Sequence, residues 1–187
     1  MRQAIRLALM ITMLVLLASC GTEDTERLAS DMRAGIVSAE DITMDIDMTA
    51  DISGDIYCFS MIYSGSSSSG SITVTAPESI SGITAAVSVD DISVTYCETA
   101  LCVGYAADNI TPASAVPVLL DQWKYGCIDR CILENADEAR LFAVSSHISD
   151  DITQTTWFSR DTLLPVRAEI YDGGYMVISC NFTDVSI

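Results

Sequence analysis

Hydrophobic and polar residues alternate one by one over much of the chain. In segment 42–48, isoleucine and methionine occupy every second position, and threonine and aspartate occupy the positions between them. Because successive side chains of a strand point to opposite faces of a sheet, this alternation predicts a strand with one buried face. Similar apolar or alternating patterns predict strands over 56–63, 72–76, 83–89, 92–96, 140–148, 151–159, 164–171 and 175–182.

Turn-forming residues separate the predicted strands. The serine- and glycine-rich segment 64–71, the pair Asp90-Asp91 and the triplet Asp172-Gly173-Gly174 each lie between two of them. Such short connections join antiparallel neighbours. The pattern therefore predicts a series of antiparallel hairpins.

Two segments have helical spacing instead. Segment 28–42 places Leu28, Met32 and Ile36 near one face, which is typical of an amphipathic helix. Segment 114–126 begins at Ser114, a possible N-cap, has a proline in its first turn and ends at a glycine. Its apolar face predicts packing on the sheet. We therefore expect an α+β domain with helices covering one face of a strongly curved antiparallel sheet.

The N-terminus has the layout of a secretory signal, with Arg2 and Arg6 ahead of the apolar block 7–18. This block is shorter than the roughly 20 residues that a membrane-crossing helix needs. The tetrad Leu17-Ala18-Ser19-Cys20 follows and is similar to a bacterial lipobox. The resemblance implies a signal peptide over 1–19 and an extracytoplasmic protein attached to the cell membrane by acyl chains, such as palmitate, on Cys20. We expect a lipidated tether over 20–27 and a single domain over 28–187.

Charge excludes several classes of partner. The chain has 26 acidic and nine basic residues, and cleavage after residue 19 removes two of the basic ones, which leaves a net charge of −19. Such a surface repels phosphate backbones and anionic head groups. We therefore expect neither nucleic-acid binding nor electrostatic attachment to a membrane.

Six further cysteines remain after Cys20, namely Cys58, Cys97, Cys102, Cys127, Cys131 and Cys180. In an exported protein they favour up to three disulfides, and the sequence does not select among the possible pairings. The close pairs Cys97/Cys102 and Cys127/Cys131 could each form a bridge. Zinc binding by these four cysteines and free buried thiols remain alternatives.

Catalytic motifs are lacking in the sequence. The one histidine, His147, shares a predicted strand face with Ser145 and Ser149, so a Ser-His-Asp hydrolase is conceivable. No G-x-S-x-G elbow surrounds a serine, and no zinc-protease, phosphate-loop or dinucleotide motif occurs. We interpret His147 as a solvent-facing strand residue and expect a protein without enzymatic activity or cofactor.

Two segments resemble LolA-like proteins, the family that includes GerS-like envelope lipoproteins. Segment 157–187, WFSRDTLLPVRAEIYDGGYMVISCNFTDVSI, is similar to the closing hairpins of that family, and segment 73–87, TVTAPESISGITAAV, is similar to its central turn and strand. The resemblance implies an open half-barrel whose curved sheet and helices enclose an apolar cavity for lipid or for an acylated envelope component.

The fold implied by this resemblance leads us to expect a set of cavity-lining residues. They are Ile46, Met48, Ile83, Val87, Val94, Leu119, Trp123, Ile170 and Ile178. In the alternative hypothesis, the protein's own side chains fill the cavity and the protein docks on another envelope protein as a regulatory partner.

Overall fold

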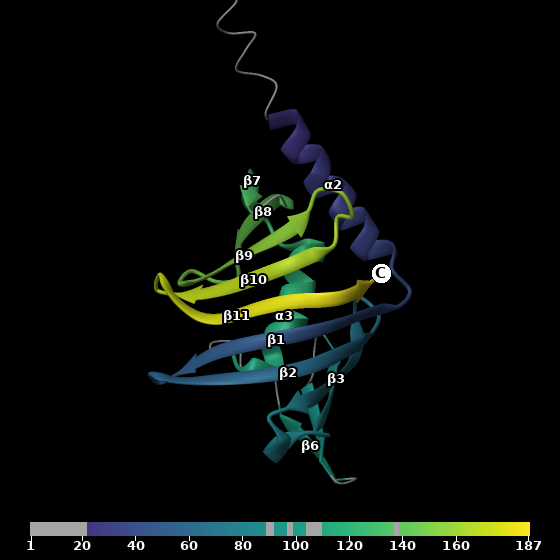
Figure 1. Ribbon diagram of the computed structural model, residues 1–187, viewed down its shortest axis with the longest axis vertical. Coiled ribbons are helices and arrows are strands. Elements are labelled where there is room, and N and C mark those ends of the chain that lie inside the picture. Colours follow the sequence, from purple (N-terminus) through teal and green to yellow (C-terminus); the bar gives the residue numbers. More distant parts are fainter. Residues whose placement is uncertain (1–21, 89–91, 97–98, 104–109, 137–138) are drawn as a thin grey trace, which may run out of the picture.

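The computed structural model describes residues 22–88, 92–96, 99–103, 110–136 and 139–187. In these ranges, two α-helices and a short 3-10 helix accompany 11 strands (Figure 1). The helices are α2 (Thr22–Ser38), α3 (Pro112–Tyr125) and η1 (Glu78–Ile80). The strands are β1 (Ile42–Ile52), β2 (Asp55–Gly65), β3 (Ser69–Ala76), β4 (Thr84–Ser88), β5 (Ile92–Tyr96), β6 (Thr99–Val103), β7 (Ile128–Ala136), β8 (Ala139–His147), β9 (Ile152–Ser159), β10 (Pro165–Asp172) and β11 (Tyr175–Ser186).

The strands form one antiparallel sheet in the order β6-β5-β4-β3-β2-β1-β11-β10-β9-β8-β7. Strands that are adjacent in the sheet are consecutive in sequence, except where the first strand pairs with the last, and the consecutive strands β6 and β7 form the two opposite edges. Ile46 of β1 lies opposite Met61 of β2 on one side and opposite Phe182 of β11 on the other. This central pairing joins two runs of hairpins into a single open sheet, so the expected α+β half-barrel is confirmed.

The alternation of apolar and polar residues in β1 matches the alternation of buried and exposed side chains along this strand. Its inward side chains are each 1% exposed, namely Ile42, Met44, Ile46, Met48 and Ala50. They point toward α3, which lies behind the central strands in Figure 1. Two strands of the structure, β6 and β7, were not predicted. The sequence of β7, IDRCILENA, is interrupted by charges and has no regular alternation, and this strand forms one edge of the sheet.

Both helices begin earlier than the sequence pattern indicated. Helix α2 starts at Thr22, so most of the expected tether is helical, and Asp24 pairs with Arg27 at 3.8 Å in its first turns. Helix α3 has Thr111 as its N-cap instead of Ser114. Thr111 Oγ1 accepts a hydrogen bond from Ser114 N at 3.3 Å, and Ser114 Oγ accepts one from Thr111 N at 2.8 Å. Ser114 is therefore the third helical residue of a capping box.

Side-chain contacts attach α3 to α2 and to the β2–β3 loop. Arg33 of α2 donates to the carbonyl oxygens of Trp123 and Gly126, at 3.3 and 2.6 Å, where the helix α3 ends and presents its negative pole. Lys124, the only lysine of the chain, is buried and donates to the carbonyl oxygen of Ser67. Residues distant in sequence thus hold α3 over the sheet.

Candidate functional site

An apolar hollow lies between strands β2–β4 and the first turn of α3. Its volume is about 190 Å³, and the eight described residues that line it are all apolar. They are Phe59, Met61, Ile72, Val74, Ile80, Ile83, Ala85 and Pro112. Strand periodicity explains the set, because positions two apart on β2 and on β3 point to the same face of the sheet. We call this cavity the apolar hollow.

The size of the apolar hollow limits what it can hold. An engineered protein cavity of about 150 Å³ lined by aliphatic and aromatic side chains stays dry and binds benzene. The apolar hollow, at about 190 Å³, is slightly larger than that cavity. In this conformation it therefore has room for an aromatic ring or for the end of one alkyl chain, but not for two complete acyl chains.

A second, larger hollow lies at the end of the sheet where the β1–β2 and β10–β11 hairpins turn. It has a volume of about 420 Å³ and mixes polar and apolar residues. They are Asp51, Ile52, Ser53, Ile110, Thr111, Pro112, Ile152, Asp172 and Val177. We call it the mouth hollow. Pro112 lines both hollows, so both border the first turn of α3.

The structure separates the residues that the sequence suggested as cavity lining. Ile83 lines the apolar hollow, and Val87 lines a small recess beside Tyr63. The side chain of Val94 is outside the described part of the structure. The other six belong to the packed cluster between sheet and α3, and none of them lines the apolar hollow or the mouth hollow. These six are Ile46, Met48, Leu119, Trp123, Ile170 and Ile178.

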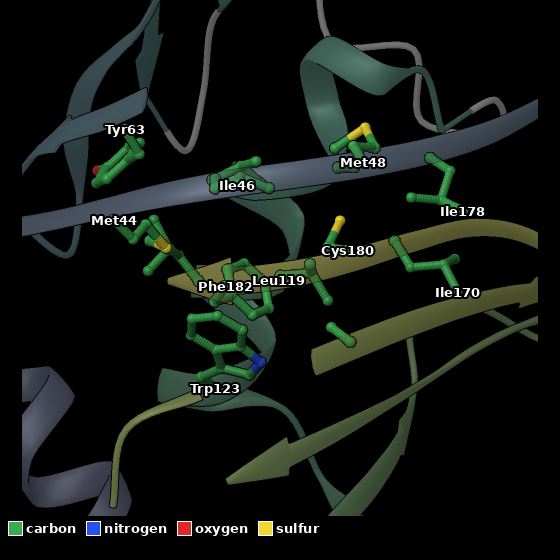
Figure 2. Packing of buried hydrophobic residues seen from close by; sticks show 14 of the residues in the cluster. Met44, Ile46, Met48, Tyr63, Leu119, Trp123, Ile170, Ile178, Cys180 and Phe182 are labelled. Carbon is green, nitrogen blue, oxygen red and sulfur yellow. The ribbon is translucent and has the colours of Figure 1, made fainter. Parts of the chain in front are cut away.

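Figure 2 shows why the centre of the half-barrel is closed. Leu119 and Trp123 of α3 lie beside Phe182 of β11 and belong to the same packed cluster as the inward side chains of β1. The Trp123 ring meets Phe158 and Phe182 edge-on, with each pair of centroids 5.6 Å apart. These contacts fill the space under the central strands, so the apolar hollow lies to one side, under β2–β4.

A chain of buried hydrogen bonds, which the sequence did not reveal, locks α3 to β8 and β9. Trp123 Nε1 donates to Thr156 Oγ1 at 2.9 Å, and that hydroxyl donates to Gln154 Oε1 at 2.6 Å. Gln154 Nε2 donates to Ser146 Oγ at 2.9 Å. The Ser146 hydroxyl in turn donates to Gln122 Oε1 at 2.9 Å. The alternation of β9 could have indicated this chain of hydrogen bonds, because this alternation places the polar residues Gln154 and Thr156 on the same buried face as Phe158.

The recess beside Val87 is nearly filled by the packing around Tyr63. Tyr63 is 1% exposed, and its hydroxyl donates to the carbonyl oxygen of Ser66 at 2.6 Å. Burial raises the pKa of Tyr63 to about 12, so the hydroxyl keeps its proton at neutral pH. This bond and that of Lys124 hold the serine-rich loop in place, and the recess itself has a volume of only about 10 Å³.

The expected disulfides among the described cysteines are wrong, because Cys58, Cys127, Cys131 and Cys180 are all free. Cys58 and Cys180 lie on opposite faces of the sheet, paired with the successive residues Thr49 and Met48 of β1. Cys127 directly precedes β7 and Cys131 lies within it, and the two thiols do not form a bridge. Cys97 and the side chain of Cys102 are outside the described part of the structure.

Thiol alkylation can check this arrangement. In the native Cys20→Ser chain at pH 8, we expect iodoacetamide to modify the exposed Cys58 and Cys127 at least about tenfold faster than Cys180. Cys180 is fully buried, and burial raises its pKa to about 12; burial also raises the pKa of Cys131. Peptide mass spectrometry measures each rate, and all four thiols should react alike in urea. Rapid native labelling of Cys180, or a disulfide-linked peptide pair among the four, would contradict the structure.

His147 is exposed, and its Nε2 lies 3.6 Å from Asp129 Oδ2. Ser145 Oγ instead hydrogen-bonds with Thr155 Oγ1 at 2.9 Å. Within the described ranges, no three His, Cys, Asp or Glu side chains gather closely enough to hold a metal ion. Neither of the described helices has the length and apolar composition needed to cross a membrane.

Comparisons with known proteins find similarity at the level of structure. No family model matches the sequence, and no curated protein matches it. A conserved protein of Thermus thermophilus is 7% identical, with a TM-score of 0.54 over 84% of this chain and 86% of that one. A DUF1329 family protein of Desulfovibrio piger is 14% identical, with a TM-score of 0.51 over 85% and 90%.

A LolA superfamily protein of Nitrosomonas europaea is also among the structural neighbours. It is 10% identical, with a TM-score of 0.48 over 87% of this chain and 93% of that chain. At these identities the first two matches show a shared fold and do not transfer an activity.

Proposed function

We propose that this protein is a non-enzymatic bacterial envelope lipoprotein that is anchored through Cys20 and binds an apolar group of a lipid or acylated envelope component. The observation that supports the proposal most directly is the apolar hollow, whose described lining residues are all apolar. Transfer of an alkyl chain from water into such a site is favourable by about 0.8 kcal/mol for each buried methylene. Binding of this kind requires no catalytic group.

The position where α2 begins limits the distance between the domain and a lipid on Cys20. Cys20 is outside the described residues, and α2 begins only two positions later, at Thr22. Two residues span at most about 7 Å. A lipid on Cys20 would therefore hold the domain against the membrane surface, so the protein would take up ligand locally instead of carrying it between membranes.

A second candidate function is docking on another envelope protein. Two neighbouring hairpins expose large apolar side chains at their turns, where β1 and β11 pair. They are Ile52, Ile56, Tyr57, Tyr175 and Met176, which are between 44% and 80% exposed. Apolar side chains grouped in this way are typical of interaction surfaces. The closed packing under α3 is also compatible with this alternative.

Native mass spectrometry of the full chain carrying Cys20→Ser tests ligand binding. We expect a bound lipid in protein purified from bacterial cells, and we expect Ala85→Phe to remove it, because Ala85 lines the apolar hollow and the larger ring fills that space. Ala86→Phe is the matched control, since Ala86 is the next residue of β4 and is exposed on the other face. A ligand-free mass together with a specific protein partner would favour the docking function.

A parallel comparison tests the anchor. With Cys20 intact, the protein should be recovered in the membrane fraction with an acylated N-terminal cysteine, and Cys20→Ser should abolish this acylation. Mass spectrometry of the N-terminal peptide measures the modification. An unmodified mature terminus would contradict the anchored form and leave ligand binding to be judged by the Ala85 variant.

A further inference from the structure

The two hollows differ in chemistry although Pro112 borders both of them. Within the described ranges, only apolar residues line the apolar hollow, whereas the mouth hollow includes two carboxylates, from Asp51 at the end of β1 and Asp172 at the end of β10. No lysine, arginine or histidine of the described part of the chain lines either hollow. A ligand that extends from one hollow into the other would therefore have an apolar part followed by a polar part.

The charge around the mouth hollow is of one sign. Asp55 lies in the same hairpin as Asp51, and the carbonyl oxygen of Asp151 accepts a hydrogen bond from Gly173 N at 3.0 Å, which places the β8–β9 turn against the β10–β11 turn. The whole segment 34–123 contains no lysine or arginine. Carboxylates without basic neighbours favour a cation and repel an anion.

The N-terminus of α3 offers little opposing attraction for an anion. Helix N-termini bind anions through free backbone N–H groups. Here the N–H groups of Thr111 and Ser114 are occupied by the capping box, and Pro112 has none. The charge that a ligand meets at the mouth hollow is therefore the negative charge of Asp51 and Asp172.

We propose that the ligand is a single-chain amphiphile with a protonated amine head group. Its head lies in the mouth hollow near Asp51 and Asp172, and the end of its alkyl chain lies in the apolar hollow beside Ala85. This inference rests on the proposed function, since it requires the apolar hollow to be a binding site, and it adds the chemical class of the ligand.

Three probes with the same chain and different heads test the inference: octylamine, octanoate and octanol. Isothermal titration of the full chain carrying Cys20→Ser should show octylamine binding about tenfold more tightly than octanoate, which corresponds to about 1.4 kcal/mol. Octanol should bind with intermediate affinity. The preference should shrink as salt is raised from about 0.01 to 0.15 M, because salt screens exposed charges.

Two sets of variants separate the head from the chain. The double variant Asp51→Asn/Asp172→Asn should reduce the preference for octylamine over octanoate to about twofold or less and leave octanol binding unchanged. Asp31→Asn/Asp184→Asn is the control, because it removes the same charge from α2 and from the far end of β11. The Ala85→Phe variant should weaken binding of all three probes, with Ala86→Phe as its control.

The possible results distinguish the two proposals. Equal affinity for octylamine and octanoate, with octanol still bound, overturns the amine head group and leaves the apolar binding site standing. An unchanged preference in the Asp51/Asp172 double variant also overturns it. Failure of both octanol and octylamine to bind overturns the proposed ligand-binding function, and the inference with it.

Discussion

Replacement of Trp123 by alanine should lower the free energy of unfolding by about 4 kcal/mol. The side chain is 3% exposed and packs edge-on against Phe158 and Phe182, so its removal leaves a large space between α3 and the sheet. It also leaves Thr156 Oγ1 without the indole donor that lies at 2.9 Å. Urea denaturation of the Cys20→Ser chain, followed by circular dichroism, measures the loss.

The protein provides a matched control in its other tryptophan. Trp157 lies on the outer face of β9, where its Nε1 donates to Glu134 Oε2 at 2.8 Å and its ring lies 5.2 Å from the Arg167 guanidinium carbon. Because this side chain is only partly buried, Trp157→Ala should cost about 1–2 kcal/mol. An equal loss of unfolding free energy in the two variants would show that the packing under α3 contributes no more to stability than the outer face of β9 does.

Replacement of Thr156 by valine should cost about 3 kcal/mol, although the two side chains have nearly the same shape. Thr156 is fully buried and accepts from Trp123 while it donates to Gln154. Valine would leave the indole N–H and the amide oxygen without partners in a dry environment. The cost of an unmatched buried polar group is about 1–3 kcal/mol, and here two such groups arise.

Thr155→Val is the control for this variant. Thr155 is the preceding residue of β9 and lies on the outer face, where its hydroxyl hydrogen-bonds with Ser145 at 2.9 Å. Water can replace that bond, so we expect a loss below about 1 kcal/mol. The same denaturation measurement applies. A Thr156→Val protein as stable as the Thr155→Val protein would mean that the buried hydrogen-bond chain does not fasten α3 to the sheet.

Prediction of the strands from the sequence succeeded where one face is buried against α3. The alternation of segment 42–48 is confirmed by β1, whose inward residues are almost completely covered. It failed at β7, which is an edge strand with Arg130 and Glu134 within it. An edge strand pairs on one side only and tolerates charge, so its sequence need not follow the regular pattern.

The candidate site could be predicted only in part. Ile83 was expected to line a cavity and does so, whereas Leu119 and Trp123 were expected to line it and instead lie in the closed packing. All three are apolar residues of elements that enclose the same interior. Whether such a side chain borders empty space or another side chain depends on where α3 lies, and periodicity contains no information about that position.

Local patterns in the sequence were enough to indicate the hairpins, the inward faces of the strands, the acidic surface and the lipobox-like tetrad. Each of these depends on residues close together in the chain. The tertiary structure alone decided that β1 pairs with β11, that Cys58 and Cys180 lie on opposite faces of the sheet, and that the apolar hollow lies under β2–β4. The physical reason is that a cavity is the volume that distant segments fail to fill, so it exists only once all of them are packed together.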